Sequence, residues 1–385
     1  MPPLKIQGQI RRLCFRGQTS ELPRYTIDDF DINGARASGI VEHPNHWAIA
    51  YSRWSSPKRT RSYPFARIYD TYWYSGKIVT VIPIVKDEGR GERRNDSNLD
   101  RITYITYSWM NLMNVYIVLA WYDSAQKQSH VRLTRQKLNS AYVRDKLCQI
   151  AEYKYDAHHW NKQHFRDDFL WVYEKAIESY RSISQRLGVG VHDIATHERF
   201  LDEVRDNHDQ KKLDLERFCS QSLDRSYRAA ANETATRHEL ERLSGVGTKA
   251  LFVLRNNLGG TYYLTADDVE IEPEGSVVIR ECKHTTRHIL PSLNDIKDGL
   301  FKLLLFAHLD SVQLGDDKQR KTRCELRLTS SKFDGELHLP SEPSVLERYC
   351  NTVHLGDRAK ESLKWLNTES ERLGIPVILE KRSDE

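Results

Sequence analysis

The last third of the chain alternates between strand-like and helix-like segments, and this alternation constrains the fold more than any other feature. A polar helical region ends at Gly245 and Gly247, and an apolar, strand-like segment, 248–256, follows it. Residues 266–284 have the pattern of two strands joined by a turn at 273–275. These segments predict a helix followed by three strands.

A second helix and further strands extend this pattern. Residues 292–309 predict an amphipathic helix, with Ser292 as N-cap and Asp295 completing a capping box. The apolar stripe of this helix consists of Ile296, Leu300, Phe301, Leu304 and Ala307. A strand, a helix and a strand are expected after it, at 323–331, 360–374 and 375–380. The order is typical of a mixed α/β sheet flanked by helices.

The patterns divide the chain into three parts. Residues 1–130 predict an α/β region. Its expected strands and one amphipathic segment lie at 66–74, 77–86, 115–122 and 99–113. Residues 131–232 are polar and have helical periodicity, and residues 233–385 hold the α/β core with its C-terminal helix and strand.

Composition excludes several classes of protein. A hydrophobic content of 39% supports a packed core, and the charged residues, 29%, are of mixed sign with a net charge of +4. The longest apolar run, 115–122, is far shorter than the roughly 20 residues that cross a bilayer, and no apolar signal-peptide segment is present. The six cysteines form no CxxC pair, which predicts reduced thiols. We therefore expect a cytoplasmic protein without membrane association.

The second arm of the predicted hairpin ends in charged residues. Glu281 and Lys283 are two positions apart, so a strand directs both side chains to one face. The turn brings the start of the first arm, at Asp268, beside the end of the second. Two carboxylates that converge in this way repel one another without a cation, and Mg²⁺ prefers such oxygen ligands. We therefore expect a magnesium site, with Lys283 placed to stabilise a hydroxide or a charged phosphate.

The motif Asp268-x12-Glu281-Cys282-Lys283, on a hairpin followed by a helix and a strand, resembles the PD-(D/E)xK nuclease superfamily. The αβββαβ core of that family matches about 233–330 in order. The resemblance implies that Asp268 and Glu281 bind Mg²⁺, with the Cys282 carbonyl as a further ligand. It also implies that Lys283 acts on the attacking water.

The resemblance leaves two positions open. The usual proline before the aspartate is missing from 266–268, so the ligand can be Asp267 or Asp268. Asp268 is preferred because it directly precedes the apolar residues of the strand, and Asp267 is then a possible additional acid. Many members add a glutamate from the preceding helix, for which the candidates here are Glu233, Glu239 and Glu241.

The function implied by the resemblance is Mg²⁺-dependent, sequence-specific cleavage of double-stranded DNA, as by type II restriction endonucleases. The alternatives are a repair, junction-resolving or transposition nuclease of the same fold, or a DNA-binding protein that does not cleave. The intact Asp268, Glu281 and Lys283 favour cleavage. A homodimer is expected because two strands must be cut, often by two-fold symmetry. A cognate DNA methyltransferase is the expected genetic partner of a restriction enzyme.

A basic and aromatic stretch, 51–67, holds five Lys/Arg residues and no acid. Such a segment predicts contacts with DNA phosphates, and a solvated basic loop is the equal alternative. The residues expected to make these contacts are Arg53, Lys58, Arg59 and Arg61, with Arg67 also available. The loop 90–94 is a further candidate for backbone contacts. Residues 1–130 are therefore the candidate DNA-recognition part of the chain.

Other motif-like patterns receive structural interpretations. A second ExK, at 152–154, lies in a helical segment and lacks a hairpin. Residues 243–251 superficially resemble a helix-hairpin-helix motif, but a helix end followed by a strand is favoured. The three histidines within 158–164 are interpreted as exposed helix residues rather than an HNH metal site. The acids within 86–89, with Asp100, are interpreted as a loop of solvated charge rather than a second acidic site.

Overall fold

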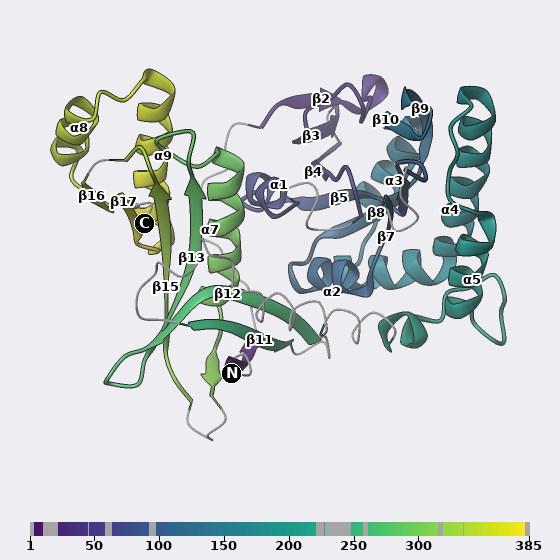
Figure 1. The fold of residues 1–385 in the computed structure, drawn as a ribbon. Helices are drawn as coiled ribbons and strands as arrows, with labels where there is room; N and C mark the ends of the chain where they lie inside the picture. The colour runs from purple at the N-terminus through teal and green to yellow at the C-terminus, as the bar shows by residue number, and fades with distance from the viewer. Residues whose placement is uncertain are drawn as a thin grey trace. The chain divides into compact units, whose positions relative to one another are not determined.

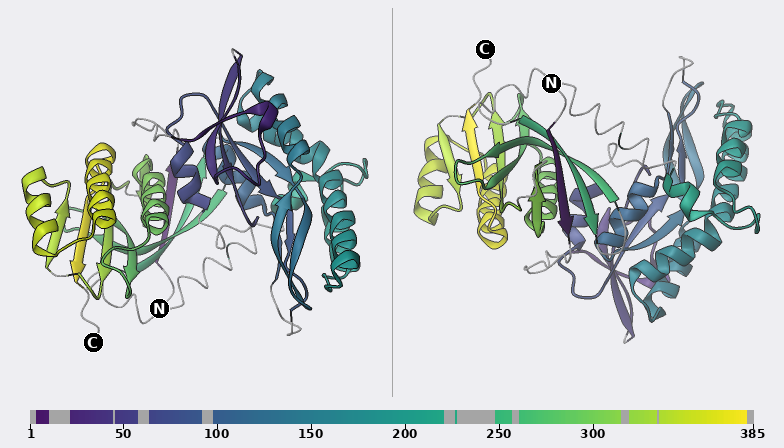
Figure 2. Two further views of the ribbon diagram at one scale, coloured as in Figure 1. Left: turned by 90° about the horizontal axis from the view of Figure 1, so that it is seen from above. Right: turned by 90° about the horizontal axis from the view of Figure 1, so that it is seen from below.

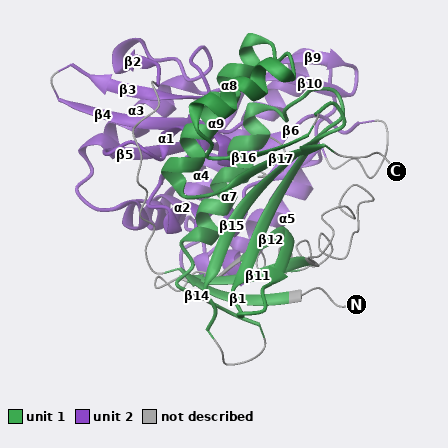
Figure 3. Cartoon of the chain, turned by 90° about the vertical axis from the view of Figure 1, so that its left-hand side faces the viewer, with its two compact units in different colours: residues 1–18, 226–385 green, residues 19–225 purple. Residues whose placement is uncertain are grey.

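The fold is that of a computed structural model, which describes residues 4–10, 22–44, 46–57, 64–91, 98–220, 227, 248–256, 261–314, 319–333 and 335–381. The chain forms two compact units, and Figure 3 shows each in its own colour. Unit 1 combines residues 1–18 with 226–385, and unit 2 consists of residues 19–225. The division near 232 in the sequence pattern thus lies close to a boundary between the units.

Unit 1 is built on an eight-stranded mixed sheet with the order β14-β1-β11-β12-β13-β15-β17-β16 (Figure 1). Its strands are β1 Leu4–Ile10, β11 Thr248–Asn256, β12 Thr261–Ile271, β13 Val277–Thr285, β14 Ser311–Gln313, β15 Thr322–Ser330, β16 Glu336–Leu339 and β17 Val377–Lys381. Its helices are α7 Leu293–Ala307, α8 Pro343–Thr352 and α9 Asp357–Leu373. The prediction of a mixed α/β sheet with helices is confirmed.

The centre of this sheet follows the predicted order of elements. Strands β11, β12 and β13 pair antiparallel in sequence, and the expected turn closes between Ile271 and Val277 with Gly275 at φ +91°. Strand β13 then pairs parallel with β15, and β15 with β17. Parallel neighbours need a crossover, and α7 supplies it between β13 and β15. The helix expected before β11, within 233–247, lies outside the described residues.

The first strand of the chain, β1, was not predicted from the sequence. It lies inside the sheet of unit 1, where it pairs parallel with β11 and antiparallel with β14. Its side chains alternate between exposed and buried, and Ile6 and Ile10 are at most 1% exposed. A region predicted to be part of an N-terminal unit therefore contributes a core strand to the C-terminal one.

Unit 2 contains a five-stranded sheet with the order β2-β3-β4-β5-β8, in which β4, β5 and β8 are parallel. Its strands are β2 Arg24–Thr26, β3 Ser38–His43, β4 Trp47–Arg53, β5 Lys77–Pro83 and β8 Tyr116–Ala120. Two short pairs accompany it, β6 Val85–Asp87 with β7 Leu99–Arg101, and β9 Tyr122–Ser129 with β10 Arg132–Leu138. Its helices are η1 Ile27–Asp29, α1 Pro64–Thr71, α2 Tyr104–Leu112, α3 Ser140–Glu152, α4 Ala157–Leu187 and α5 Ile194–Val204.

Two predictions in unit 2 are wrong. Residues 66–74, expected as a strand, lie mostly in α1, because Pro64 favours a first helical turn and the buried Phe65, Ile68 and Tyr69 have helical spacing. Residues 131–155, expected as helix throughout, begin with β10 before α3. The strands expected at 77–86 and 115–122 and the helix within 99–113 are confirmed by β5, β8 and α2.

The helices of unit 2 begin and end as their sequences favour. Asn139 caps α3 by accepting from the Tyr142 N–H, and Asp156 caps α4 by accepting from the His159 N–H. Gly188 ends α4 with φ +60°, a conformation that glycine adopts without strain. Among the described residues, no helix is both long and apolar enough to cross a membrane. Figure 2 shows α3 and α4 in teal, beside the strands of unit 2.

Candidate functional site

The candidate site lies in unit 1, on the face of the sheet that α7 covers. Gly299 brings α7 close to the charged end of β13: a Cβ at this position would lie 3.2 Å from Lys283 Cε and 3.5 Å from Glu281 Cγ. The same Cβ would lie 3.0 Å from Leu326 Cδ1 of β15. The glycine therefore allows the helix to pack directly over the two predicted site residues.

The register between β12 and β13 decides which acid shares this face. Asp268 pairs with Arg280, and Ile271 pairs with Val277 at the other end of the hairpin. Continuing this register by one residue places Asp267 opposite Glu281, and directly opposed residues of an antiparallel pair lie on one face. The Cys282 N–H donates to Asp267 Oδ2 at 2.9 Å, which fixes this carboxylate beside the strand end.

Glu281 is held between two lysines. Lys283 Nζ lies 2.9 Å from Glu281 Oε1, and Lys302 Nζ, from α7, lies 2.7 Å from Oε2. Glu281 is 2% exposed, and burial alone would raise its pKa, but the charges of Lys283 and Lys302 lower the pKa to about 2. The glutamate is therefore ionised at neutral pH, with both carboxylate oxygens in ion pairs.

Lys283 is surrounded by acids. Burial favours its neutral form, but the charges of Glu281, Asp267 and Asp298 outweigh burial and raise the pKa of Lys283. Its Nζ also lies 3.8 Å from Oδ2 of Asp298. Asp298 is on α7, one helical turn before Lys302. Lys283 is thus an ammonium ion and a hydrogen-bond donor at neutral pH.

In contrast to Glu281 and Lys283, Asp267 has a pKa that is shifted in favour of its neutral form. Burial and the negative charge of Glu281 raise the pKa of Asp267 to about 6, against the opposing charges of Lys302 and Lys283. Its Oδ1 has no hydrogen-bond partner among the described residues, since the one bond to its carboxylate goes to Oδ2. A carboxylate in this state would be stabilised by a further cation.

The sequence-based assignment of Asp268 to this cluster is corrected by the structure. Asp268 lies on the opposite face, where Arg280 Nη1 donates to its Oδ2 at 3.0 Å. Arg280 also contacts Glu270 and Glu325, so Asp268 belongs to a mostly buried network of opposite charges. The physical reason is the pairing register, because the period of two along a strand sends adjacent aspartates to opposite faces.

The donor atoms of the site suit a hard divalent cation. Asp267 and Glu281 supply carboxylate oxygens, and the Cys282 carbonyl lies between Glu281 and Lys283 in sequence. The described residues contain no group of three or more His, Cys, Asp or Glu side chains that could hold a metal ion. Mg²⁺ commonly binds through one or two carboxylates, with water and substrate phosphate as its other ligands, so two carboxylates are sufficient. Metal binding at Glu281 would replace one of its two lysine contacts with a contact to the ion.

Sequence reasoning did not identify Lys302 and Asp298 as members of the site. The signal for Lys302 was present, since a lysine within the apolar run 300–306 is a buried charge in need of a partner. Lys302 is 5% exposed, and its partner is Glu281.

Several predicted residues cannot be related to the site. Lys58, Arg59 and Arg61 lie outside the described residues, as do Glu233, Glu239 and Glu241. Arg53 lies in unit 2, at the end of β4, where its Nη1 donates to the Ile32 carbonyl. Arg90 also lies in unit 2, where it pairs with Asp193.

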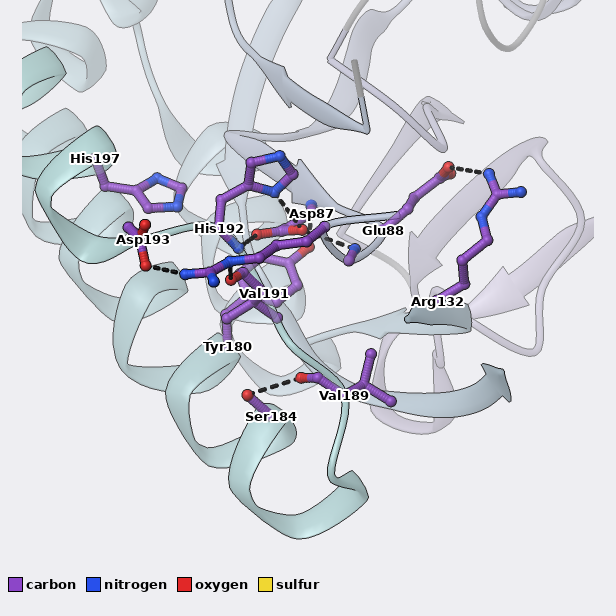
Figure 4. Close-up of polar contacts among 12 residues, drawn as sticks. Asp87, Glu88, Arg132, Tyr180, Ser184, Val189, Val191, His192, Asp193 and His197 are labelled. Carbon is purple, nitrogen blue, oxygen red and sulfur yellow. Dashed lines mark hydrogen bonds and ion pairs between the residues drawn. The ribbon is translucent and has the colours of Figure 1, made fainter. Parts of the chain in front are cut away.

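The acids of β6 and β7 are not a loop of solvated charge, which corrects that interpretation. Asp87 is fully buried and accepts hydrogen bonds from the N–H groups of Gly89 and His192, both at 2.8 Å (Figure 4). His192 Nδ1 lies 3.0 Å from Asp87 Oδ1. Asp100 is 1% exposed and accepts from the Ser56 hydroxyl at 2.7 Å. The bonds to His192 connect the segment after α4 to β6, so Asp87 has a structural role.

The expectation that the histidines of α4 are exposed is wrong for His164. This residue is 3% exposed, its Nε2 accepts from the Leu119 N–H at 3.0 Å, and its Nδ1 contacts Asp168 at 2.7 Å. Asn161 is also buried, and it bonds to the backbone of Ile117 and Val115. Both side chains connect α4 to β8, which accounts for them without a metal site.

Comparison with known proteins adds no family to these observations. No family model, curated protein or solved structure matches the chain.

Proposed function

We propose that the chain is a Mg²⁺-dependent nuclease that hydrolyses phosphodiester bonds in double-stranded DNA. The observation that carries the proposal is the grouping of Asp267, Glu281 and Lys283 on one face of the sheet, close enough to perturb one another's pKa. The order of β11, β12, β13, α7 and β15, with the ExK tripeptide on β13, supports it through the resemblance to PD-(D/E)xK nucleases.

The side chains have distinct roles in this proposal. Asp267 and Glu281 would hold the ion, and a bound Mg²⁺ supplies charge neutralisation at the phosphate and a more acidic water. Lys283 remains protonated because its pKa is raised, so it stabilises negative charge on the attacking oxygen or the phosphate and does not act as a general base. Lys302 holds Glu281 in place from α7.

We assign the nuclease to the sequence-specific type II restriction class. In support, the chain carries a second compact unit in addition to the core, as an enzyme with added recognition elements requires. A homodimer acting on double-stranded DNA and a cognate DNA methyltransferase as genetic partner belong to the same proposal. Repair, junction-resolving or transposition nucleases are the alternatives, and the cleavage pattern distinguishes them.

The adjacent aspartates provide a matched test of the site. Asp267→Asn and Lys283→Met are expected to lower the rate of plasmid cleavage in Mg²⁺ by at least about 100-fold. The first removes a charge that would hold the ion, and the second removes a charge that acts on the reacting phosphate. Asp268→Asn should cleave within about threefold of the wild type, since it changes the opposite face and leaves Arg280 paired with Glu270 and Glu325. Thermal denaturation of each variant checks its folding.

The outcomes separate the possible assignments. Discrete fragments from wild-type protein indicate a restriction enzyme, whereas cutting only at branched DNA indicates a junction-resolving one. Loss of cleavage in Asp268→Asn but not in Asp267→Asn would place the metal on the other face and overturn the assignment. A folded wild-type protein that cuts neither plasmid nor branched DNA in Mg²⁺ contradicts the proposed activity.

A further inference from the structure

A cavity of about 280 Å³ lies in unit 2, apart from the candidate nuclease site. Its wall includes basic, amide and aromatic side chains and no carboxylate among the described residues. The residues used below are Arg53, Arg67, Arg135, Lys137, Trp54 and Tyr122.

The cavity lies where open α/β sheets bind ligands. Strands β4, β5 and β8 are parallel, and their carboxyl ends meet at one edge of the sheet. Arg53 is the last residue of β4, and Tyr122 follows the end of β8. The backbone N–H of Trp54 donates to the Val81 carbonyl of β5 at 2.9 Å, and this hydrogen bond connects the cavity wall to the central parallel strand. Ligands of such sheets bind outside the carboxyl ends of the strands.

Two arginines with no acidic partner form one side of the cavity. Arg67, on α1, donates through Nη1 to the Arg53 carbonyl, and Arg53 donates through Nη1 to the Ile32 carbonyl. Burial and the charge of Arg53 lower the pKa of Arg67, and the interactions with Tyr122 and Asp70 offset this only in part. Neither arginine forms an ion pair with a described carboxylate, and an anion between them would relieve the repulsion.

The hairpin of β9 and β10 adds two more cations. Arg135 and Lys137 line the cavity and are otherwise exposed, and neither forms an ion pair with a described residue. Arg135 has φ +46°, a conformation uncommon for a side chain of this size, and it persists only where the surrounding structure holds it. The cavity therefore gathers four cationic side chains from three elements.

A buried donor without a partner points to the same ligand. Trp54 lines the cavity and is 2% exposed, yet its Nε1–H has no hydrogen-bond partner among the described residues. An unsatisfied buried N–H costs roughly as much free energy as a lost hydrogen bond. A ligand that offers acceptor oxygens would satisfy it together with the arginines.

The ligand also has room beyond its charged group. A second cavity of about 260 Å³ shares Ser55, Tyr122, Arg135 and Gln136 with the first. It adds the polar side chains of Thr134 and Gln128 and the ion pair of Lys86 with Glu88. The Tyr122 hydroxyl donates to the Ser55 carbonyl at 2.8 Å and fixes the wall common to both cavities. An anionic group in the first cavity can thus be attached to a polar group in the second.

We propose that this cavity binds a terminal phosphate group, carried either by a nucleotide or by the end of a nucleic acid strand. A terminal phosphate is a compact dianion with three acceptor oxygens, which matches two guanidinium groups, an indole N–H and two further cations. The sequence predicts that Arg53 and Arg67 contact phosphates, and their position in a cavity favours a terminal group over the continuous backbone of a duplex.

Calorimetric titration of the full chain without Mg²⁺ tests the proposal, using inorganic phosphate, adenosine monophosphate, and one oligonucleotide with or without a 5′-phosphate. Arg53→Gln is expected to weaken binding on the order of tenfold, and Arg135→Asn about three- to tenfold. Asparagine tolerates φ +46°, so the second variant should fold even where the first does not. Lys127→Gln, an exposed substitution on β9 outside the cavity, should bind like the wild type.

The choice of probe identifies the source of the phosphate. Tighter binding of the phosphorylated oligonucleotide than of its hydroxyl counterpart indicates a strand end, and preference for the mononucleotide indicates a free nucleotide. The absence of millimolar binding by every phosphate probe would overturn the proposal, as would equal binding by Arg135→Asn and the wild type. Because no cleavage is measured, the result is independent of the proposed nuclease activity.

Discussion

Asp267 has a pKa close to neutral pH, unlike its neighbours Glu281 and Lys283 in the candidate site. Its neighbour Glu281 is kept ionised by two lysines, while Asp267 has its pKa raised to about 6 by burial and by the charge of Glu281. Two carboxylates on one strand pair therefore differ widely in acidity. Such separation is common where a site must hold a cation and remain able to exchange protons near neutral pH.

The raised pKa of Asp267 makes folding stability dependent on pH. Between its ordinary pKa of 3.8 and about 6, the folded state binds more protons at this carboxyl than the unfolded state does. The contribution of Asp267 to stability is therefore greatest at low pH and is lost as pH rises through this window. Above pH 6 Asp267 is ionised in both states, and its charge is less favourable in the folded state than in the unfolded state.

Asp267→Asn should therefore stabilise the protein at pH 8, by roughly 3 kcal/mol at most, and have a smaller effect at pH 4. Asparagine can still accept the Cys282 N–H, so the hydrogen bond to the strand end is retained. Urea unfolding of both proteins at the two pH values measures the difference. Glu361→Gln, at an exposed position of α9, is the control. Equal stability changes for Asp267→Asn at both pH values would contradict the assigned pKa.

The pairing register of β12 and β13 limits which residues of the candidate site could be predicted from the sequence. Glu281 and Lys283 are predictable because their spacing alone places them on one face. Asp267 and Asp268 are not distinguishable in this way, because the choice depends on the number of residues in the turn. With Ile271 and Val277 as the closing pair, the opposing residue of Glu281 is Asp267, and this pair is visible only in the structure.

Among the elements, α7 positions the site most directly. It provides Lys302 and Asp298, and Gly299 lets its backbone approach β13 and β15. The sequence predicted this helix and its cap correctly, because Ser292 and a regular apolar stripe are local signals. The strand β10 was mispredicted because it depends on pairing with β9 rather than on local periodicity. The helix α1 was mispredicted although Pro64 and the helical spacing of Phe65, Ile68 and Tyr69 are local signals.

Gly299→Ala should distinguish the effect of helix propensity on stability from the effect of Lys283 placement on cleavage. Alanine favours a helix interior by about 1 kcal/mol, but its Cβ would lie 3.0 Å from Leu326 Cδ1 and 3.2 Å from Lys283 Cε. We expect cleavage to fall about three- to tenfold, because Lys283 must shift, while thermal stability changes by less than about 1 kcal/mol. Asn294→Ala, at an exposed position of α7, is the control. Wild-type cleavage by Gly299→Ala would show that the position of Lys283 tolerates this displacement.

At the scale of the whole molecule, unit 1 is discontinuous in sequence. Strand β1 joins a sheet whose other strands all lie beyond residue 247, so the unit closes only when the two ends of the chain meet. No local signal could predict this contact, because a short strand with alternating exposed and buried residues, as at 5–10, has no preferred partner. The composition of the chain predicted a packed core, and the order of strand-like and helix-like segments predicted an α/β fold, but neither predicted which parts belong to each unit.

This connectivity predicts that a change at the N-terminus affects the unit that holds the candidate site. Ile6 is fully buried and pairs with Phe252 of β11, and Ile6→Ala should destabilise unit 1 by about 2 to 4 kcal/mol through the lost contacts and the remaining cavity. Unit 2, residues 19–225, should keep its own unfolding transition, because its core does not include β1.

Differential scanning calorimetry and hydrogen exchange measure this separation. In Ile6→Ala, amides of β11 and β12 should lose protection while those of β5 and β8 remain as in the wild type. Gln7→Ala is the matched control, since this neighbouring side chain of β1 is exposed and its removal should leave both transitions unchanged. Equal loss of protection in β5 and β8 would mean that the two units unfold as one, and the discontinuous strand would then stabilise the entire chain.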